Sequence, residues 1–273
     1  MNDADCIAFL QWALPQIDLR WPGFRKVRRQ VCKRVRRRMS DLDIADFAGY
    51  RARLAADPAE WRVLDACCHI TISRFFRDRG IFEVLRRRVL PAIAARAARE
   101  QRAAAVWSAG CAAGEEPYTL KILWDLEIAR SHPGVPLSLV ATDIDADMLA
   151  RARRGCFNRS SLHELPPALA DEAFERRGTL HCIRPHHRAG IAFLHQDLRS
   201  QMPDGPFDLV LCRYVAFTYF AEPLQRTIAA QIADRLMPGG YLAIGTHETL
   251  PEGIPALAPL AGAALIFEKG TGL

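Results

Sequence analysis

The sequence of 273 residues lacks any uninterrupted apolar run close to the roughly 20 residues that a membrane-spanning helix needs. It begins MNDADC, and an acidic start does not match a secretory signal peptide. It also has no internal repeat and no low-complexity linker. These absences predict a cytoplasmic protein without membrane insertion.

Patterns typical of metal sites and disulfide frameworks are missing as well. The eight cysteines are scattered and show no CxxC spacing. None of the eight histidines pairs with acids at metal-ligand spacing. We therefore expect no metal site, no disulfide framework and reduced thiols, as in cytosolic proteins.

What the sequence does contain is an uneven distribution of its net charge of +6. In FRKVRRQVCKRVRRRM (24–39), Val27, Val31, Val35 and Met39 recur every four residues, which places them on one face of a helix. The other faces carry Arg25, Lys26, Arg28, Arg29, Lys33, Arg34, Arg36, Arg37 and Arg38. Such a helix is typical of proteins that bind nucleic acid, an anionic membrane or an acidic protein segment, and also of solvated surfaces. Phe24 is the only aromatic residue of the segment, so it offers no stacking series for nucleic acid.

The periodicity changes along the chain. Residues 3 to 92 have mostly helical patterns, whereas strands and helices alternate after residue 103. Strands are predicted at 103–108, 137–142, 191–195, 207–212, 241–246 and 263–269, and helices at 117–130, 145–153 and 222–236. This alternation predicts an open, doubly wound parallel sheet with helices on both faces. We expect a helical domain with a linking helix at 1–92 and an α/β domain at 93–273.

The segment VWSAGCAAGEEPY (106–118) contains the most informative motif. It is typical of a strand, a turn of small residues and a helix start. Gly110 and Gly114 allow a ligand to approach the backbone, and the helix start offers unpaired N–H groups. Glu115 and Glu116 argue against a phosphate, and the lysine of a P-loop is absent. A neutral or cationic ligand with hydroxyl groups fits better.

A second strand ends in an acid that supports this interpretation. The apolar run LSLVA (137–141) leads into Thr142 and Asp143. An acid at the end of the second strand of a βαβ unit typically binds ribose hydroxyls. Together the two motifs predict a nucleoside cofactor. The alternative is a plain βα turn in a Rossmann-like domain that binds no cofactor.

Several segments carry a family resemblance. WSAGCAAGEEPY, ATDIDADMLARARRGCF, GPFDLVLCRYVAFTYF and RLMPGGYLAIGTHE resemble the CheR-type chemotaxis-receptor glutamate methyltransferases. ADFAGYRARLAADPAEWRVLDACCHITISRFFRD is similar to the helical domain and linking loop of that family. The resemblance covers nearly the whole chain. It implies a small all-α N-terminal domain before a class I methyltransferase domain that binds S-adenosylmethionine (SAM) and has a small β insert.

The resemblance also implies a set of site residues. Asp143 would hold the ribose hydroxyls, Glu116 would lie near the cationic methionyl part of SAM, and Asp197 and Leu198 would border the adenine. The full cofactor set, with the two glycines of the loop, is Thr71, Ser73, Arg77, Gly110, Gly114, Glu116, Asp143, Asp197, Leu198, Arg213 and Tyr214. Arg77 and Tyr219 would be the catalytic residues, Arg77 by orienting a carboxylate and Tyr219 beside the methyl donor.

The chain departs from the family pattern at specific positions. The family usually has Cys-Arg-Asn-Val followed by Ile-Tyr-Phe, whereas this chain has Tyr214 in place of Asn and one extra residue before Tyr219. Thr71 also stands where Asn is usual. The segment that corresponds to the β insert, about 174–191, is short, which does not favour tethering to a receptor tail.

We therefore predict a SAM-dependent O-methyltransferase that converts a protein glutamate carboxylate to a methyl ester. The alternatives are a methyltransferase with a small-molecule or RNA acceptor and a SAM-binding protein without activity. The expected partner is an acidic helical segment of an acceptor protein such as a chemoreceptor or another signalling protein, and nucleic acid is not expected.

Overall fold

The computed structural model describes residues 3–271, and its contacts divide the chain into two compact units. The smaller unit combines Met1–Ile70 with Thr218–Gln225, and the larger unit combines Thr71–Phe217 with Arg226–Leu273. The larger unit thus begins before residue 93, where the sequence suggested the domain boundary. The physical reason is that the helical stretch from residue 79 to residue 99 supplies buried side chains such as Phe82 and Ile93 to the core of the larger unit.

The smaller unit consists of short helices and one returning segment of the chain. Its elements are α1 (Asp3–Ala13), η1 (Leu14–Ile17), α2 (Trp21–Phe24), α3 (Arg28–Asp41), α4 (Phe47–Ala56) and α5 (Glu60–Cys68). On α3, Val31, Val35 and Met39 are fully buried, as their four-residue spacing predicted. Buried Glu60 accepts two hydrogen bonds from Arg38, at 2.9 and 2.7 Å, so this arginine of the basic helix is already neutralised within the unit.

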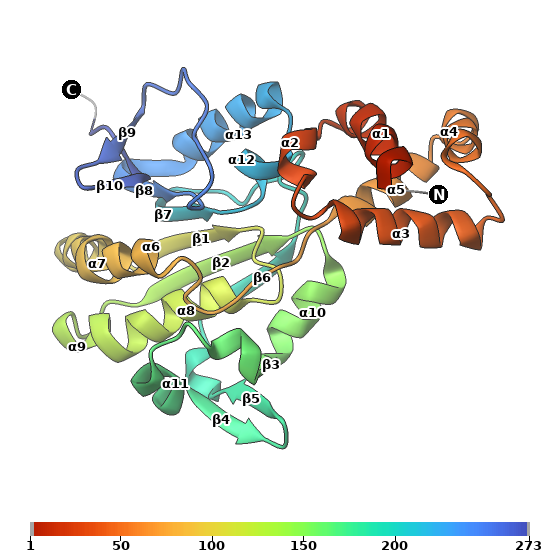
Figure 1. Ribbon diagram of the computed structural model, residues 1–273. Helices are drawn as coiled ribbons and strands as arrows, with labels where there is room; N and C mark the ends of the chain where they lie inside the picture. The colour runs from red at the N-terminus through yellow and green to blue at the C-terminus, as the bar shows by residue number, and fades with distance from the viewer. Residues whose placement is uncertain (1–2, 272–273) are drawn as a thin grey trace. The chain divides into compact units, whose positions relative to one another are not determined.

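The larger unit is built on a seven-stranded sheet with strand order β6-β2-β1-β7-β8-β10-β9 (Figure 1). Its strands are β1 (Ala104–Ala109), β2 (Leu137–Asp143), β6 (Ile191–His195), β7 (Phe207–Cys212), β8 (Leu236–Ala243), β9 (Leu257–Leu260) and β10 (Ala263–Lys269). The strands from β6 to β8 pair in parallel, whereas β10 pairs antiparallel with both β8 and β9. The strand order reverses next to β1, and in doubly wound sheets ligands bind beyond the carboxyl ends of the strands at such a point.

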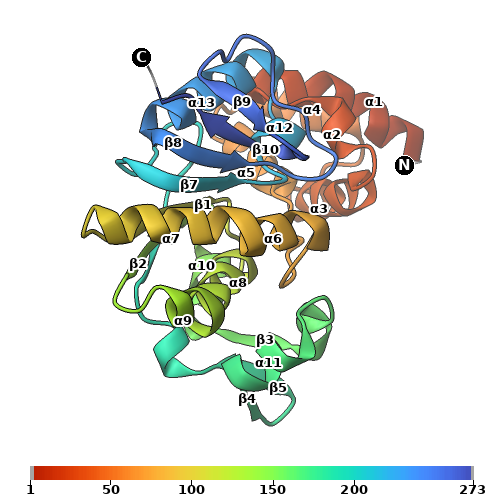
Figure 2. The ribbon, with the colours of Figure 1, turned by 90° about the vertical axis from the view of Figure 1, so that its left-hand side faces the viewer.

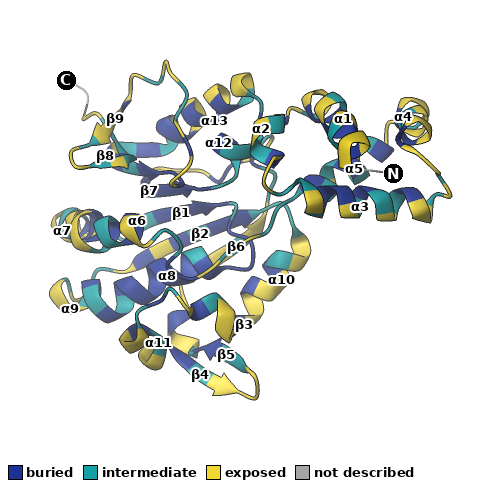
Figure 3. Ribbon diagram, viewed as in Figure 1, coloured by how far each residue is buried: buried dark blue, intermediate teal, exposed yellow. Residues whose placement is uncertain are grey.

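Helices cover this sheet and bury its central strands. They are α6 (Arg79–Val84), η2 (Leu85–Val89), α7 (Leu90–Arg99), α8 (Glu115–Leu123), η3 (Trp124–Ile128), α9 (Ala129–Ser131), α10 (Ala146–Arg154), α12 (Ala216–Tyr219) and α13 (Glu222–Arg235). Helices α6 and α7 form one continuous rod through η2, beside β1 (Figure 2). Every residue of β7 is buried, and α8 is buried along almost its whole length (Figure 3). Burial on both faces explains why the central strands are continuous apolar runs.

A second, three-stranded sheet with the order β3-β5-β4 forms the insert. Its elements are β3 (Cys156–Asn158), η4 (Arg159–Leu162), α11 (Pro167–Ala173), β4 (Phe174–Arg177), β5 (Leu180–Ile183) and η5 (Pro185–His187). Cys156 and Cys182 lie directly opposite each other on β3 and β5 and form a disulfide.

The prediction of entirely reduced thiols is wrong, because a second disulfide joins Cys6 to Cys32 in the smaller unit. Both pairs are separated by 26 residues in the sequence. Sequence spacing could not reveal them, since the fold brings each pair together across two elements. Cys67, Cys68, Cys111 and Cys212 form no disulfide. Over residues 3–271, no helix combines the length and the apolar character needed to cross a membrane.

Candidate active site

The glycine loop follows β1 and is fastened to the end of β2. The backbone N–H groups of Gly110 and Cys111 both donate to the carbonyl oxygen of Thr142, at 2.8 and 2.9 Å. Gly110 has φ +76°, and a Cβ atom there would lie 2.2 Å from Cγ2 of Val215. Glycine is therefore required at this position by both the backbone conformation and the contact with the segment after β7.

Asp143 joins this loop to the start of α10. Its Oδ2 accepts a hydrogen bond from the backbone N–H of Ala112 at 2.7 Å, and its Oδ1 accepts one from that of Asp145 at 2.9 Å. Ala112 has φ +47°, a left-handed conformation that is uncommon for a residue other than glycine. These two bonds fix the half-buried carboxylate of Asp143 at the carboxyl end of β2.

The two acids that open α8 have different environments. Glu116 has both oxygens engaged: Oε1 accepts from the hydroxyl of Ser108, and Oε2 accepts from Nη1 of Arg213, each at 2.7 Å. Glu115 is only 3% exposed, and its Oε2 is buried without a hydrogen-bond partner among the described residues. Burial raises the pKa of Glu115, and the hydrogen bond with Ser73 partly opposes this shift.

Arg213 is the centre of a buried polar network at the end of β7. Its Nη1 reaches Glu116, and its Nη2 donates to the carbonyl oxygen of Arg77 and to Oδ2 of Asp78, each at 2.7 Å. Burial alone would lower the pKa of Arg213, but the charges of Glu116 and Asp78 outweigh it and raise that pKa above its usual value. The network therefore links the glycine loop to the segment that precedes α6.

Tyr214 extends the network. Its hydroxyl donates to Oδ2 of Asp78 at 2.5 Å and accepts from the backbone N–H of Thr246 at 3.1 Å. Burial acts to raise the pKa of Asp78, yet the hydrogen bond from Tyr214 and the charge of Arg213 lower it below its usual value. Asp78 is thus held as a carboxylate between the two residues.

Arg77 lies over the ring of Tyr214, with its guanidinium carbon 3.9 Å from the ring centroid. Its Nη1 donates to the carbonyl oxygen of Ile72 at 2.5 Å. Ser73, four residues earlier in the chain, contacts Glu115, and half-buried Thr71 begins the same segment. The structure therefore places the predicted residues of this segment in the larger unit together with the glycine loop.

Asp197 and Leu198 follow β6, the neighbour of β2. The backbone N–H of Gln196 donates to the carbonyl oxygen of Asp143 at 3.1 Å, which holds this segment beside the end of β2. The carboxylate of Asp197 accepts hydrogen bonds from the guanidinium of Arg199, and Leu198 is buried.

Tyr219 belongs to the smaller unit and is described there. Its ring centroid lies 4.9 Å from that of Phe24, and its carbonyl oxygen accepts from the backbone N–H of Arg20 at 2.8 Å. A Cβ atom on Gly23 would lie 2.2 Å from the carbonyl oxygen of Thr218, so this glycine permits the returning segment to pack closely. The catalytic role expected for Tyr219 stays a prediction.

Comparison with known proteins decides the family. Residues 71–262 match the family described as CheR methyltransferase, SAM binding domain. The chain belongs to this CheR family. A probable chemotaxis protein methyltransferase of Rhizobium etli is 32% identical over 225 residues, which cover 80% of this chain and 83% of that protein. The class I methyltransferase fold that the sequence predicted is confirmed, with the helices of the N-terminal part before the sheet.

Two other relatives of this CheR chain extend well beyond the residues that align with it. A chemotaxis protein methyltransferase of Listeria innocua is 33% identical over 181 residues, which cover 66% of each protein. An uncharacterised 104.1 kDa protein of Rhodobacter capsulatus is 33% identical over 220 residues, which cover 81% of this chain but only 23% of that protein. The match thus spans less than two thirds of the length of both relatives.

The donor set of this CheR domain fits the cofactor that defines the family. Carboxylates gather at the loop: Asp143, Glu115 and Glu116 lie around the start of α8 and the end of β2. One of their oxygens, Oε2 of Glu115, is buried without a partner in the described part of the chain. Such a site favours a ligand that is cationic and rich in hydroxyl groups, as SAM is, over an anion. The prediction of SAM as the cofactor is confirmed for the family.

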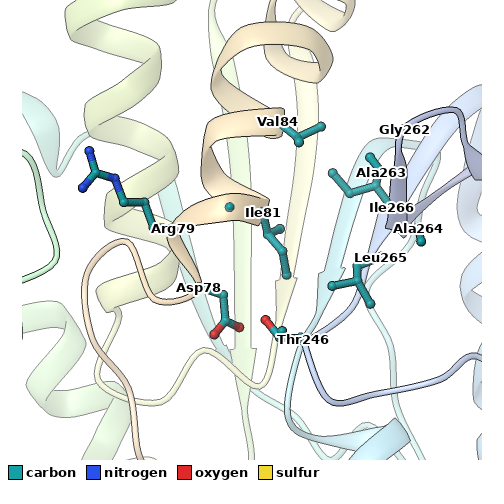
Figure 4. A pocket seen from close by; sticks show the side chains of 11 residues that line it. Asp78, Arg79, Ile81, Val84, Thr246, Gly262, Ala263, Ala264, Leu265 and Ile266 are labelled. Atoms are coloured by element: carbon teal, nitrogen blue, oxygen red, sulfur yellow. The ribbon is translucent and has the colours of Figure 1, made fainter.

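A pocket of about 500 Å³ has Asp78 among its lining residues (Figure 4). Its walls are apolar side chains of α6 and β10, including Ile81, Val84 and Leu265, and Thr246 lies near Asp78 at one end. The glycine loop contributes nothing to its lining. Asp78, which the sequence interpretation missed, therefore both lines this pocket and binds Arg213 and Tyr214.

Two further residues of the site were not in the predicted set of site residues. Ser108 supplies the hydroxyl that fixes Glu116, and Glu115 carries the unpartnered oxygen. Glu115 was available from the motif itself, because it stands beside Glu116 at the same helix start. No pattern in the sequence marks Ser108 or Asp78, because their partners lie on other elements.

Proposed function

We propose that this protein is a SAM-dependent O-methyltransferase that converts the carboxylate of a protein glutamate side chain to a methyl ester. The observation that carries the proposal is the position of Arg77. Its main chain is bound by Arg213, which also binds Glu116 of the cofactor loop, and its guanidinium retains donors without partners in the described chain. A planar guanidinium is suited to bind a carboxylate through two parallel hydrogen bonds.

The methyl transfer requires little from the protein beyond the correct orientation of the acceptor and the cofactor. The cofactor supplies a methyl group activated by its positively charged sulfonium. A glutamate side chain, with an ordinary pKa of about 4.3, is already an oxygen nucleophile at neutral pH, so no general base is needed. The roles of the chain are to align the acceptor oxygen, to exclude water and to leave one lone pair of the carboxylate free. We assign the alignment to Arg77 and a packing or hydrogen-bonding role beside the methyl group to Tyr219.

Residues of the larger unit would hold the cofactor. Asp143 would bind the ribose hydroxyls, and Gly110 and Gly114 would allow close approach to the loop. Glu116, with Glu115 beside it, would bind the cationic methionyl part. The remaining proposed contacts come from Thr71, Ser73, Asp197, Leu198 and Arg213.

The smaller unit provides the surface for an acidic partner. Arg25, Lys26, Arg29, Lys33 and Arg37 are exposed, and their side chains form no ion pair or hydrogen bond within the described chain. The last three recur every four residues and form one stripe along α3. A stripe of this kind complements an acidic helical segment of an acceptor protein. The names of the relatives, chemotaxis protein methyltransferases, favour a signalling protein as that acceptor.

The cytoplasmic location expected from the sequence is part of the same proposal. Disulfides are rare in the cytosol, and this chain has two. Labelling of thiols in intact cells, followed by mass spectrometry of Cys6 and Cys32, tests the location. Reduced cysteines would support it, and oxidised cysteines would favour an oxidising compartment.

The experiment that tests the activity uses SAM with a labelled methyl group, the purified protein and a panel of acceptors. The panel contains the cytoplasmic domain of a chemoreceptor, a variant of that domain with its acidic helical residues changed to amides, an RNA pool and small carboxylic acids. We expect label on the first acceptor only, and release of the label as methanol in mild base, since carboxyl methyl esters hydrolyse there.

Three results would contradict the proposal. Label that resists base would indicate N-methylation, and label on RNA or on a small acid would indicate one of the alternative acceptors. Tight binding of SAM with no transfer to any acceptor would indicate a SAM-binding protein without activity.

A further inference from the structure

The ring of Tyr214 is fixed at three points. Its backbone N–H donates to Oε2 of buried Glu248 at 2.9 Å, and its hydroxyl bonds to Asp78 and to the backbone N–H of Thr246. Its φ of +58° is a left-handed conformation, which an aromatic residue adopts only where its surroundings hold it. The ring is therefore anchored through its backbone and its hydroxyl, and its faces remain available for packing.

The strand end next to Tyr214 is shaped around this ring. A Cβ atom on Gly245 would lie 2.8 Å from Cε1 and Cζ of Tyr214, closer than carbon atoms approach each other. Oε2 of Glu248 also accepts from the backbone N–H of Gly245 at 2.6 Å, so one carboxylate fixes both residues. The missing side chain of Gly245 thus makes room for the ring of Tyr214. A smaller residue at position 214 would not require a glycine at position 245.

The guanidinium of Arg77 packs on this ring. Its central carbon lies 3.9 Å from the centroid, well within the distance of a cation–π contact. Its Nη1 is bound by the carbonyl oxygen of Ile72, and its Nε and Nη2 have no partner in the described chain. The ring and the carbonyl together restrict a side chain that otherwise has many rotamers.

We propose that Tyr214 is the positioning residue of Arg77. Its ring holds the guanidinium in one orientation, so that Nε and Nη2 are presented as a pair of donors to the acceptor carboxylate. This inference rests on the proposed function for the role of Arg77 in binding the acceptor. The contact between Tyr214 and Arg77 does not depend on the proposed function. The sequence resemblance assigned Tyr214 to the cofactor, and that assignment stays a prediction; the hydroxyl and the backbone N–H of Tyr214 bind Asp78, Thr246 and Glu248.

Two substitutions distinguish the contribution of the aromatic ring of Tyr214 from that of its hydroxyl group. Tyr214→Phe keeps the aromatic face and removes the bonds to Asp78 and Thr246, whereas Tyr214→Leu removes the face. We expect Tyr214→Leu to lower kcat for a carboxylate acceptor by about tenfold to a hundredfold, because a misplaced orienting group has effects of that size. Tyr214→Phe keeps the ring but loses two of its anchoring bonds, so it should lower kcat less than Tyr214→Leu does, and both variants should bind SAM as the wild type does. Tyr214→Met, whose longer and flexible side chain adapts to the space of the ring, replaces Tyr214→Leu if the latter does not fold.

A measurement that needs no turnover tests the pairing itself. In proton–nitrogen NMR spectra of protein labelled with nitrogen-15 arginine, the Nε–H signal of Arg77 is assigned by its loss in Arg77→Lys. A guanidinium above an aromatic face experiences its ring current, so the signal should lie upfield in the wild type and in Tyr214→Phe. It should return to the position of other arginines in Tyr214→Leu.

The results distinguish the two proposals. An Arg77 signal that is not displaced in the wild type overturns the positioning role, whatever the enzyme methylates. A loss of SAM affinity in Tyr214→Phe and Tyr214→Leu with kcat unchanged also overturns it, in favour of a cofactor contact. If no carboxylate acceptor is methylated but the Arg77 signal depends on the ring as described, the proposed function fails and the pairing stands.

Discussion

Arg213 donates a hydrogen bond to Glu116 at 2.7 Å, although the two residues are separated by 97 positions in the sequence. The side chain of Arg213 is 3% exposed and that of Glu116 is 13% exposed, so the pair is nearly removed from water. A buried ion pair is stable only when its remaining donors and acceptors are also satisfied. Ser108, Asp78 and the carbonyl oxygen of Arg77 satisfy most of them. The pair therefore joins the start of α8, directly after the glycine loop, to the segment of Arg77.

Asp143→Ala should weaken binding of SAM or of its demethylated product by about 2–3 kcal/mol, the range for hydrogen bonds to a charged group. Titration calorimetry measures the effect. Asp143 also binds the N–H groups of Ala112 and Asp145, so Asp143→Asn, which retains one acceptor oxygen, checks that the loss is not one of folding. Asp147→Ala, an exposed acid in the first turn of α10, is the control. Unchanged affinity in a folded Asp143→Ala protein would mean that the ribose is bound elsewhere.

Asp208→Asn should destabilise the larger unit by roughly 3–5 kcal/mol, because it leaves two arginines without their buried partner. Asp208 is fully buried and accepts from Arg102 at 2.7 and 2.8 Å and from Arg96 at 2.6 Å. Burial acts to raise the pKa of Asp208, but these bonds lower it below its usual value. The stabilisation is therefore complete above the ordinary aspartate pKa of about 3.9 and is lost as the pH falls through the lower pKa of the folded protein.

Urea unfolding between pH 7 and pH 3 measures this contribution. The wild type should lose stability in acid more steeply than Asp208→Asn, which lacks the titrating group. Asp204→Asn, at an exposed position nearby in the sequence, is the matched control and should follow the wild type. Parallel acid profiles for the wild type and Asp208→Asn would show that this cluster does not determine acid stability.

The parts of the fold that could be predicted are those set by local patterns. The buried run FDLVLC forms β7, and the small-residue turn before GEEPY forms the glycine loop, as the sequence indicated. β9 was missed because LAPL is short and contains Pro259, which disfavours a strand except at an edge. The parts that could not be predicted depend on contacts between distant segments. Asp78 and Tyr214 are 136 residues apart, and neither carries a local sign of the bond between them.

Replacement of Cys6 and Cys32 by serine should destabilise the smaller unit by about 3 kcal/mol, because the closed loop restricts the unfolded chain. Both cysteines are fully buried, and 26 positions separate them. Urea unfolding followed by circular dichroism measures the loss, and Cys67→Ser, at a free thiol of the same unit, is the control. A reductant should destabilise the smaller unit of the wild type as the substitutions do, whereas in the double variant it can break only the disulfide between Cys156 and Cys182 of the larger unit. If mass spectrometry finds both thiols free in the wild type, the disulfide is absent in solution.

Arg77→Ala should reduce turnover of a carboxylate acceptor by about a hundredfold, because orientation is most of what the reaction requires. Arg77→Lys should recover little of it, since an ammonium group does not reproduce the planar pair of donors. Arg79→Ala removes an exposed arginine two residues away and should leave turnover unchanged. Steady-state kinetics with saturating SAM measures all three variants. Turnover of Arg77→Lys equal to that of the wild type would exclude a two-bond contact with the acceptor.

The basic stripe of α3 yields the prediction that concerns the partner. Arg29, Lys33 and Arg37 are exposed and have no described ion pair, whereas Arg28, Arg34 and Arg38 are bound to Asp3, to backbone carbonyls and to Glu60. Changing the three exposed residues to glutamate should therefore leave the fold and the affinity for SAM intact. It should raise KM for an acidic protein acceptor, because the stripe would then repel the acceptor and slow encounter.

Salt and a matched control determine whether this effect is electrostatic. Screening shortens the Debye length from about 30 Å at 0.01 M to about 10 Å at 0.1 M, so the increase in KM should be largest at low ionic strength. The control reverses Arg87, Arg99 and Arg154, three exposed arginines of the larger unit, and changes the net charge by the same amount. If both triple variants raise KM equally, the net charge and not the stripe attracts the acceptor. If neither does, α3 presents an ordinary solvated surface, and the acidic partner loses its structural support.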